Sequence, residues 1–226
     1  MLSSWGVCFE AIDVEAEPAA MDLLRSLGVP RVPAVVVGDQ VVHGWNPRKV
    51  AALVGIDYIE PAHLSTDELR QRLDRMLAAA QAAIRQFPAE RLQEKTPGRN
   101  RTVRQLGYHI FRLALALRDG IEGGEYPEAW IDEQAPPEIV DGEDIARYGQ
   151  RVRACLQKWF GQARWTGEVH TYYGPQTAYE LLERTVWHVA QHVRQLSVLL
   201  EQTGIPPSLP LSEADWQGLP LPQEIW

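Results

Sequence analysis

The chain has 226 residues, enough for one large domain or two small ones, and 45% of them are hydrophobic, as is ordinary for a globular protein. Its net charge is −8 without a prominent Lys/Arg cluster, which disfavours a nucleic acid as partner, because phosphate binding depends on concentrated positive charge. No apolar run reaches the roughly 18 residues of a membrane span, and we expect neither a membrane partner nor a signal peptide. Because Cys8 and Cys155 are the only cysteines, we expect no disulfide framework and predict a cytoplasmic protein.

The character of the sequence changes near residue 60. Before this point short apolar runs alternate with short helical patterns, whereas long amphipathic helices dominate after it. We therefore predict an α/β domain over residues 1–58, a linker over residues 59–63 that contains Pro61, a helical bundle over residues 64–204, and a Pro- and Trp-rich tail over residues 205–226.

The first domain is predicted to contain short strands and helices. Phe9–Asp13 is expected to form a strand, and Pro18–Leu27 a helix with proline in its first turn. Two β-branched runs, Ala34–Val37 and Gln40–His43, flank a Gly-Asp pair, which indicates a hairpin. Asn46-Pro47, an N-cap residue followed by proline, opens the last helix of this domain.

This order of elements, over residues 1–57, resembles the C-terminal two-thirds of a glutaredoxin or thioredoxin-like domain. Val32-Pro33, just before the strand, carries the resemblance. In that family the matching proline is cis, and the backbone beside it pairs with a thiol-bearing peptide such as glutathione. The resemblance therefore implies thiol binding at Val32 and Pro33. The Cys-x-x-Cys of the family is missing, and Cys8 lies outside its position, so the domain either begins late or is degenerate.

Four long helices are predicted after the linker. Ser65, Thr102 and Thr177 each stand three residues before a Glu or Gln, which is the capping-box pattern, and Asp141 can start a further helix. Apolar residues follow each start at helical spacing, and Gly204 stops the last helix. Four helices joined partly by long connections indicate a bundle with a crossover.

The remaining segments are predicted to lack regular helices. Gly123–Val140 is expected to form a cap or a rim loop, and Trp165–Gly174 alternates weakly, as an extended segment does. The tail from Pro206 is expected to pack along the surface without regular structure.

Three histidines are predicted to face the interior of this bundle. His188 and His192 lie one helical turn apart, and His109 lies among apolar residues of the second helix. Buried imidazoles need partners for their ring nitrogens, and a shared divalent metal would satisfy one nitrogen of each. The alternative interpretation is that they are ordinary packing residues. Position 189 is valine, so the glutamate of the HExxH motif is absent and a zincin protease is disfavoured.

His109, the pair His188-x-x-x-His192 and the following Arg194-Gln195-Leu196 resemble the DinB / YfiT-like superfamily, over about residues 64–204. The resemblance implies a four-helix bundle that holds a divalent metal, often zinc or nickel, on these three histidines. Several members are thiol-dependent S-transferases or isomerases that use mycothiol, bacillithiol or glutathione. Arg194 is a candidate to meet a carboxylate of such a thiol; the alternative is a solvated or structurally paired arginine.

Together the resemblances predict an α+β protein with two domains: a partial thioredoxin-like α/β domain followed by an all-α DinB-like four-helix bundle. The leading hypothesis is a divalent-metal-dependent transferase, because three neutral imidazoles leave open coordination positions and a thiolate is the reactive form of a thiol. Its partners would be a low-molecular-weight thiol and an electrophile, and an incomplete first-domain sheet favours a homodimer. The alternatives are a non-catalytic metal- or thiol-binding module and a metal-dependent hydrolase. No catalytic residue beyond the metal ligands follows from the sequence.

Overall fold

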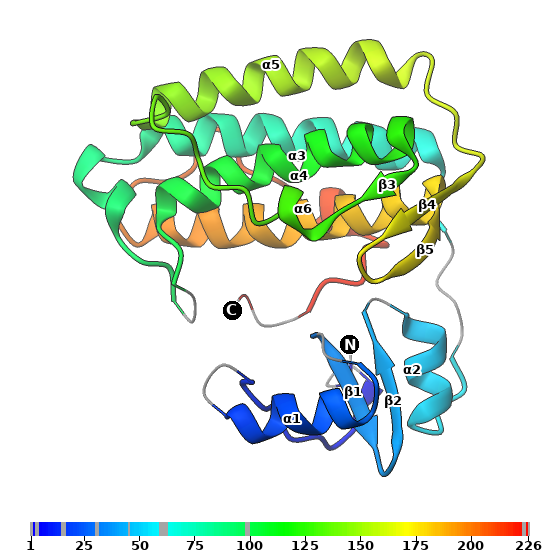
Figure 1. Ribbon diagram of the computed structural model, residues 1–226. Coiled ribbons are helices and arrows are strands. Elements are labelled where there is room, and N and C mark those ends of the chain that lie inside the picture. Colours follow the sequence, from blue (N-terminus) through cyan, green and yellow to red (C-terminus); the bar gives the residue numbers. More distant parts are fainter. Residues whose placement is uncertain are drawn as a thin grey trace. The chain divides into compact units, whose positions relative to one another are not determined.

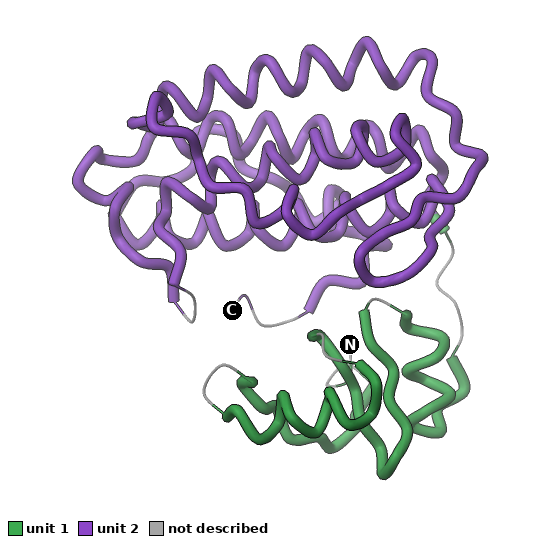
Figure 2. The backbone as a smooth tube through the Cα atoms, in the orientation of Figure 1, with its two compact units in different colours: residues 1–63 green, residues 64–226 purple. Residues whose placement is uncertain are grey.

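Two compact units make up the chain, residues 1–63 and residues 64–226 (Figure 2). The structure is a computed structural model, which describes residues 2, 5–14, 17–29, 32–44, 46–58, 63–97, 100–222 and 225. Among these residues, no helix has both the length and the apolar character that crossing a membrane requires.

The first unit contains two helices and a hairpin (Figure 1). α1 spans Pro18–Ser26 and α2 spans Pro47–Leu53. β1 (Ala34–Val37) and β2 (Gln40–His43) pair antiparallel across a two-residue turn. The predictions for these four elements are confirmed, because proline at helix starts and a tight turn between β-branched runs are local signals.

The strand predicted over Phe9–Asp13 is wrong. Residues 7–13 have irregular structure, and within the described residues the sheet of this unit consists of β1 and β2. A strand needs a hydrogen-bonded neighbour, and this segment has none there. Phe9 and Ile12 are 49% and 47% exposed, so their apolar side chains do not form a buried strand face.

The peptide bond between Val32 and Pro33 is cis, as the glutaredoxin resemblance implies for that proline. The described residues of the first unit otherwise form the hairpin and two helices alone. A thioredoxin-like domain therefore remains a prediction for this unit.

Four long helices form the second unit (Figure 1). α3 spans Thr66–Gln86, α4 spans Val103–Gly123, α5 spans Gly142–Phe160 and α6 spans Ala178–Glu201. α3 and α4 each pack mainly against α5 and α6, so the order around the bundle is α3–α5–α4–α6. The predicted bundle with long connections is confirmed.

Side-chain caps fix the starts of these helices. Ser65, Asp141 and Thr177 form reciprocal capping boxes with the acidic residue three positions later. Thr102 accepts a hydrogen bond from the backbone nitrogen of Gln105 at 3.2 Å. The side chain of Gln105 does not complete that box, because it instead binds the connection between α4 and α5.

The core lies between the four helices and consists mainly of aliphatic side chains. The larger fully buried residues are Leu69, Leu73, Met76, Leu77, Ile84, Leu92, Leu106, Ile110, Phe111, Leu113, Leu117 and Tyr126. Their removal from water supplies the main driving force for assembling the bundle.

A small sheet at one end of the bundle corrects the all-α prediction (Figure 1). β3 (Glu125–Tyr126) pairs parallel with β4 (Glu168–Thr171), which pairs antiparallel with β5 (Gly174–Thr177). The extended segment predicted over Trp165–Gly174 thus contributes strand β4. β3 was missed because two residues have no readable period and their partner lies far away in the sequence.

The connections and the tail contain short helices: η2 spans Ala89–Gln93, η3 spans Glu128–Trp130 and α7 spans Glu213–Trp216. α7 corrects the prediction of a tail without regular structure, whereas the other described residues of the tail are irregular, as predicted. Backbone carbonyls along its length accept hydrogen bonds from the long helices.

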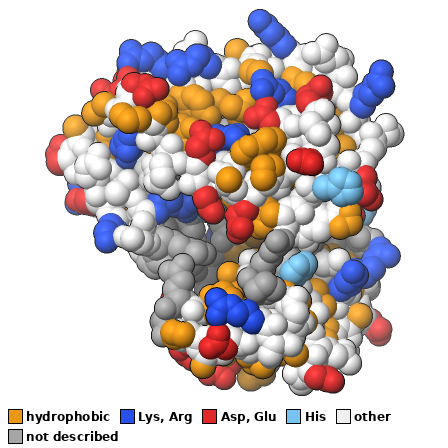
Figure 3. Space-filling model, in the orientation of Figure 1, with side chains coloured by type: hydrophobic (Ala, Val, Ile, Leu, Met, Phe, Trp, Pro, Cys, Tyr) orange, Lys and Arg blue, Asp and Glu red, His pale blue; other side chains and the backbone are white. Residues whose placement is uncertain are grey.

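Charged side chains of both signs are interspersed on the face that Figure 3 presents. Some charged side chains of the second unit form pairs between helices, such as Arg85 with Glu143 at 2.8 Å and Arg153 with Asp74 at 3.0 Å. Exposed pairs of this kind contribute little to stability.

Candidate metal centre

Three histidines from two helices lie together between α4 and α6. His109 comes from the second turn of α4, and His188 and His192 lie one turn apart on α6. The ring centroids of His188 and His192 are 4.7 Å apart, and that of His109 lies 5.7 Å and 5.0 Å from them. One ring nitrogen of each residue lies within 4.8 Å of the others. The structure thus brings together the three residues selected from the sequence.

Hydrogen bonds orient two of these rings. Nδ1 of His192 lies 2.7 Å from Oε1 of Gln195, and the ring of His109 forms a hydrogen bond with the backbone of Ile131. Because an amide oxygen only accepts, Nδ1 of His192 donates, and Nε2 carries the lone pair of a ligand atom. Such outer hydrogen bonds are typical of metal-binding histidines.

The environment keeps the rings of His109 and His188 uncharged. Burial lowers the pKa of His109 and of His188 well below the usual 6.5, and the neighbouring His192 lowers both further. The guanidinium of Arg101 acts on both rings in the same direction, and that of Arg184 acts on His188. The two imidazoles are therefore neutral at pH 7, which is the form that binds a metal.

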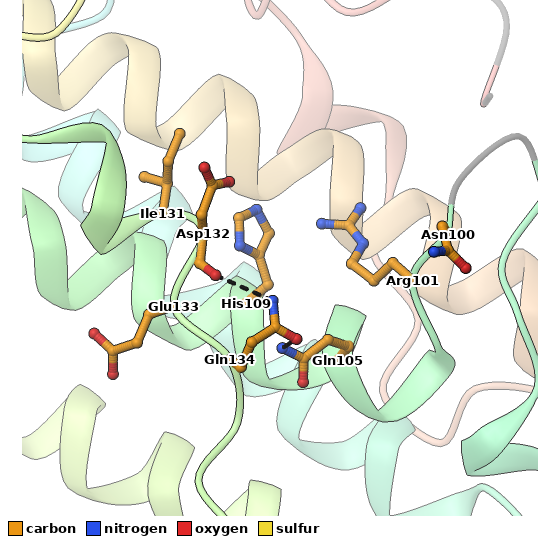
Figure 4. Close-up of a pocket in the computed structure, with 8 residues that line it drawn as sticks. All are labelled: Asn100, Arg101, Gln105, His109, Ile131, Asp132, Glu133 and Gln134. Carbon is orange, nitrogen blue, oxygen red and sulfur yellow. Dashed lines mark hydrogen bonds between the residues drawn. The ribbon is translucent and has the colours of Figure 1, made fainter. Parts of the chain in front are cut away.

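A cavity of about 120 Å³ opens beside His109 (Figure 4). The imidazole of His109 and the guanidinium of Arg101 extend towards the same space. The remaining walls come from the segment before α4, from α4 itself and from the connection after η3: Asn100, Gln105, Ile131, Asp132, Glu133 and Gln134. The volume suits a few water molecules or one small reacting group.

A family model described as the DinB superfamily matches residues 72–196. The chain belongs to the DinB superfamily. Among solved structures, a DinB-like protein from Bacillus subtilis matches with a TM-score of 0.50 and 16% identity, over 63% of this chain and 95% of that one. At this identity the likeness shows the DinB fold alone. A comparison with curated proteins finds no match.

The histidine cluster of this DinB bundle fits a divalent metal. Its donors are three imidazoles, which suit zinc, copper, iron and nickel. Two of the rings are kept neutral by burial, and His192 is held in a defined orientation by Gln195. Three protein ligands leave coordination positions open, as catalytic zinc sites do.

An ion pair between a buried arginine and a half-exposed glutamate supports the wall of the cavity. Glu133 accepts hydrogen bonds from Tyr108 Oη and from Arg112 Nε, each at 2.7 Å. Arg112 is only 5% exposed and also faces Asp119 at 3.7 Å. Hydrogen bonds to the carboxylate keep the pKa of Glu133 below its ordinary value, although burial acts in the opposite direction. This network fixes the α4–α5 connection against α4.

Structural partners hold three tyrosines of this unit, Tyr108, Tyr172 and Tyr173. Tyr108 binds Glu133, as described above. Arg184, one turn before His188 on α6, lies 3.6 Å above the ring centroid of Tyr173 and donates to Tyr172 Oη at 3.3 Å. None of the three tyrosines is among the residues that line the cavity.

The other predicted residues lie outside the cavity. Arg194 donates to the carbonyl of Pro222 at 2.7 Å and does not line the space beside His109. Val32 and Pro33 belong to the first unit, and thiol binding there remains a prediction. His170 is exposed on β4.

Several wall residues of the DinB site were missed. Asp132 and Gln134 lie in an irregular connection, where no periodicity marks their direction. Arg101 stands directly before the Thr102 cap. Its place in the wall of the cavity depends on the packing of α4 against α6, which the sequence around Arg101 does not indicate. The contact of Gln195 with His192, outside this wall, is predictable from the sequence, because their i, i+3 spacing puts both on one helix face.

Proposed function

We propose that the chain is a divalent-metal-dependent transferase that uses a low-molecular-weight thiol of the glutathione, bacillithiol or mycothiol type, with zinc or nickel as the metal. The observation that carries the proposal is the cluster of His109, His188 and His192, with ligand nitrogens within 4.8 Å of one another beside a cavity. A cytoplasmic location, where thiols remain reduced, belongs to the same proposal.

The chemistry rests on charge at the histidine cluster. When bound, the metal would supply the positive charge that favours the thiolate form of a thiol. The three histidines would hold it, and His109 and His188, which burial keeps neutral, add no charge of their own. Arg101, with its guanidinium directed into the cavity, would attract an anionic thiol and orient its polar part.

The size of the cavity limits what reacts inside it. About 120 Å³ accommodates the thiol-bearing end of a small molecule but not a whole tripeptide thiol. The remainder of the thiol and much of the electrophile would therefore lie outside the cavity. Asn100 and Gln134, at its wall, offer amide groups that can bind such polar parts.

A metal-dependent hydrolase is the second candidate. Asp132 lines the cavity beside His109, where a carboxylate can accept a proton from an attacking water. This function needs no thiol, so the two candidates differ in a measurable requirement.

Metal content and thiol dependence test the proposal together. We expect about one metal per chain by elemental analysis after loading with zinc or nickel, and little in His188→Ala. His170→Ala, which changes an exposed histidine of the same unit, is the matched control. The loaded protein should conjugate glutathione or a related thiol to a standard electrophile, and His188→Ala should not.

Each other outcome contradicts a defined part of the proposal. Ester or amide cleavage without a thiol would favour the hydrolase. Metal uptake without turnover of any thiol would leave a metal-binding module. Absence of metal after loading would overturn the whole proposal and return the histidines to a packing role.

A further inference from the structure

We propose that the C-terminal tail is part of the metal centre, because the carbonyl of Ile225 orients Gln195 and thereby sets which nitrogen of His192 carries the ring proton. Gln195 is thus a positioning residue. The inference rests on the metal-binding half of the proposed function and is independent of its thiol chemistry.

A continuous chain of hydrogen bonds connects the tail to the ligand. Nε2 of Gln195 donates to the carbonyl oxygen of Ile225 at 2.8 Å, and Oε1 of Gln195 lies 2.7 Å from Nδ1 of His192. Gln195 and His192 are 9% and 8% exposed. Because both side chains are buried, water cannot readily replace either bond.

The chemistry of the groups fixes the direction of each bond. A backbone carbonyl only accepts, so Gln195 must present its NH₂ group to Ile225 and its oxygen to His192. That oxygen also only accepts, so Nδ1 of His192 must carry the ring proton. In its neutral form, which is the form that binds a metal, the imidazole has one such proton, and Nε2 then carries the lone pair.

Loss of the tail carbonyl would remove this constraint. The amide of Gln195 could then turn over and donate to Nδ1 of His192. The ring proton would move to Nε2, the nitrogen that a metal requires. Metal binding would have to reverse both changes, and the affinity would fall.

The tail is anchored on α6 immediately before this point. Arg194 donates to the carbonyl of Pro222 at 2.7 Å, and Trp187 Nε1 donates to that of Pro220 at 2.9 Å. Ile225 is thereby tied to the same helix that bears His192.

Variants at both ends of the hydrogen-bond chain test the inference. One chain ends after Pro222 and lacks Ile225; another carries Gln195→Met, which lacks the acceptor for His192. In both we expect zinc affinity, measured by competition with a chromophoric chelator, to fall about 10–100-fold. In the metal-free proteins, ¹⁵N NMR of the His192 ring should change from a single Nδ1–H tautomer to a mixture.

Gln195→Glu provides a rescue. Either oxygen of a carboxylate accepts from Nδ1 of His192 without help from Ile225, so this variant should bind zinc equally well with and without the tail. Gln86→Ala is the matched control, because it removes the tail contacts to Pro206 and Ser208 at the far end. It should leave zinc affinity and the tautomer unchanged.

The outcomes separate the inference from the metal site itself. Unchanged zinc affinity and a single tautomer in the chain that ends after Pro222 would overturn the inference, as would equal sensitivity of Gln195→Glu to the shortening. Absence of zinc binding in the full wild-type chain would instead contradict the proposed function. Circular dichroism of every variant identifies loss of affinity that results from unfolding.

Discussion

The imidazole rings of His109 and His192 lie 5.0 Å apart, centroid to centroid, although α4 and α6 are separated in sequence by the whole of α5. This contact exists only when the two helices are packed. A metal that bridges these rings would therefore stabilise the folded bundle over the unfolded chain.

Metal binding is expected to raise the stability of the wild-type protein. At a zinc concentration about 100 times the dissociation constant, the free energy of unfolding should increase by about 2.7 kcal/mol. Urea unfolding with and without zinc measures this increase. In His192→Ala the increase should disappear; an equal increase in that variant would show that zinc acts elsewhere.

Stability of the metal-free protein is expected to fall below pH 6.5. Burial lowers the folded-state pKa of His109 and of His188 well below that value. Between the lowered pKa and about 6.5, the unfolded chain binds more protons than the folded one. The free energy of unfolding therefore decreases as the pH is lowered through this range. Above about pH 7 the rings are neutral in both states, and their contribution is constant.

A double variant separates the contribution of His109 and His188 to this pH dependence from the contribution of the carboxylates. Urea unfolding of the chelator-treated wild-type protein at about pH 7.5 and pH 5.5 measures how much its free energy of unfolding decreases between the two. His109→Gln with His188→Gln should lose less stability over the same range. An identical loss in both proteins would mean that other groups account for it.

Removal of the Glu133 carboxylate is expected to destabilise the cavity wall. Glu133→Ala leaves the buried guanidinium of Arg112 without its 2.7 Å partner. The expected cost is about 2 kcal/mol, below the ~3–5 kcal/mol of a fully buried pair, because the Glu133 side chain is 45% exposed. Chemical denaturation measures it. Glu138→Ala, an exposed change in the same connection, should cost no more than about 0.5 kcal/mol.

Two glycines on long helices should respond oppositely to alanine. A Cβ on Gly149 would lie 2.5 Å from ring atoms of Phe111, whose side chain is fully buried. The overpacking costs about 1–3 kcal/mol and outweighs the gain in helix propensity. Gly123 has no atom within 4 Å of an added Cβ, so Gly123→Ala should stabilise by about 0.5 kcal/mol. Thermal unfolding compares the two, and equal effects would contradict the close α4–α5 packing.

Local signals carried much of the sequence prediction. The caps at Ser65, Asp141 and Thr177 depend on residues three positions apart, and the structure has all of them. The strand predicted over Phe9–Asp13 failed because a strand depends on a neighbour, which its own residues do not specify. The same reason explains why β3 was missed.

The sequence by itself determined the helices of the bundle and the placement of His188 and His192 on one face of a helix, because hydrogen bonds and side-chain spacing within a helix are local. Only the tertiary structure decided the rest of the site. It brought His109 to the pair, made a cavity wall of Arg101 and Glu133, and set Ile225 against Gln195. These contacts join residues far apart in the chain, and they form because the four helices bury their apolar faces against one another.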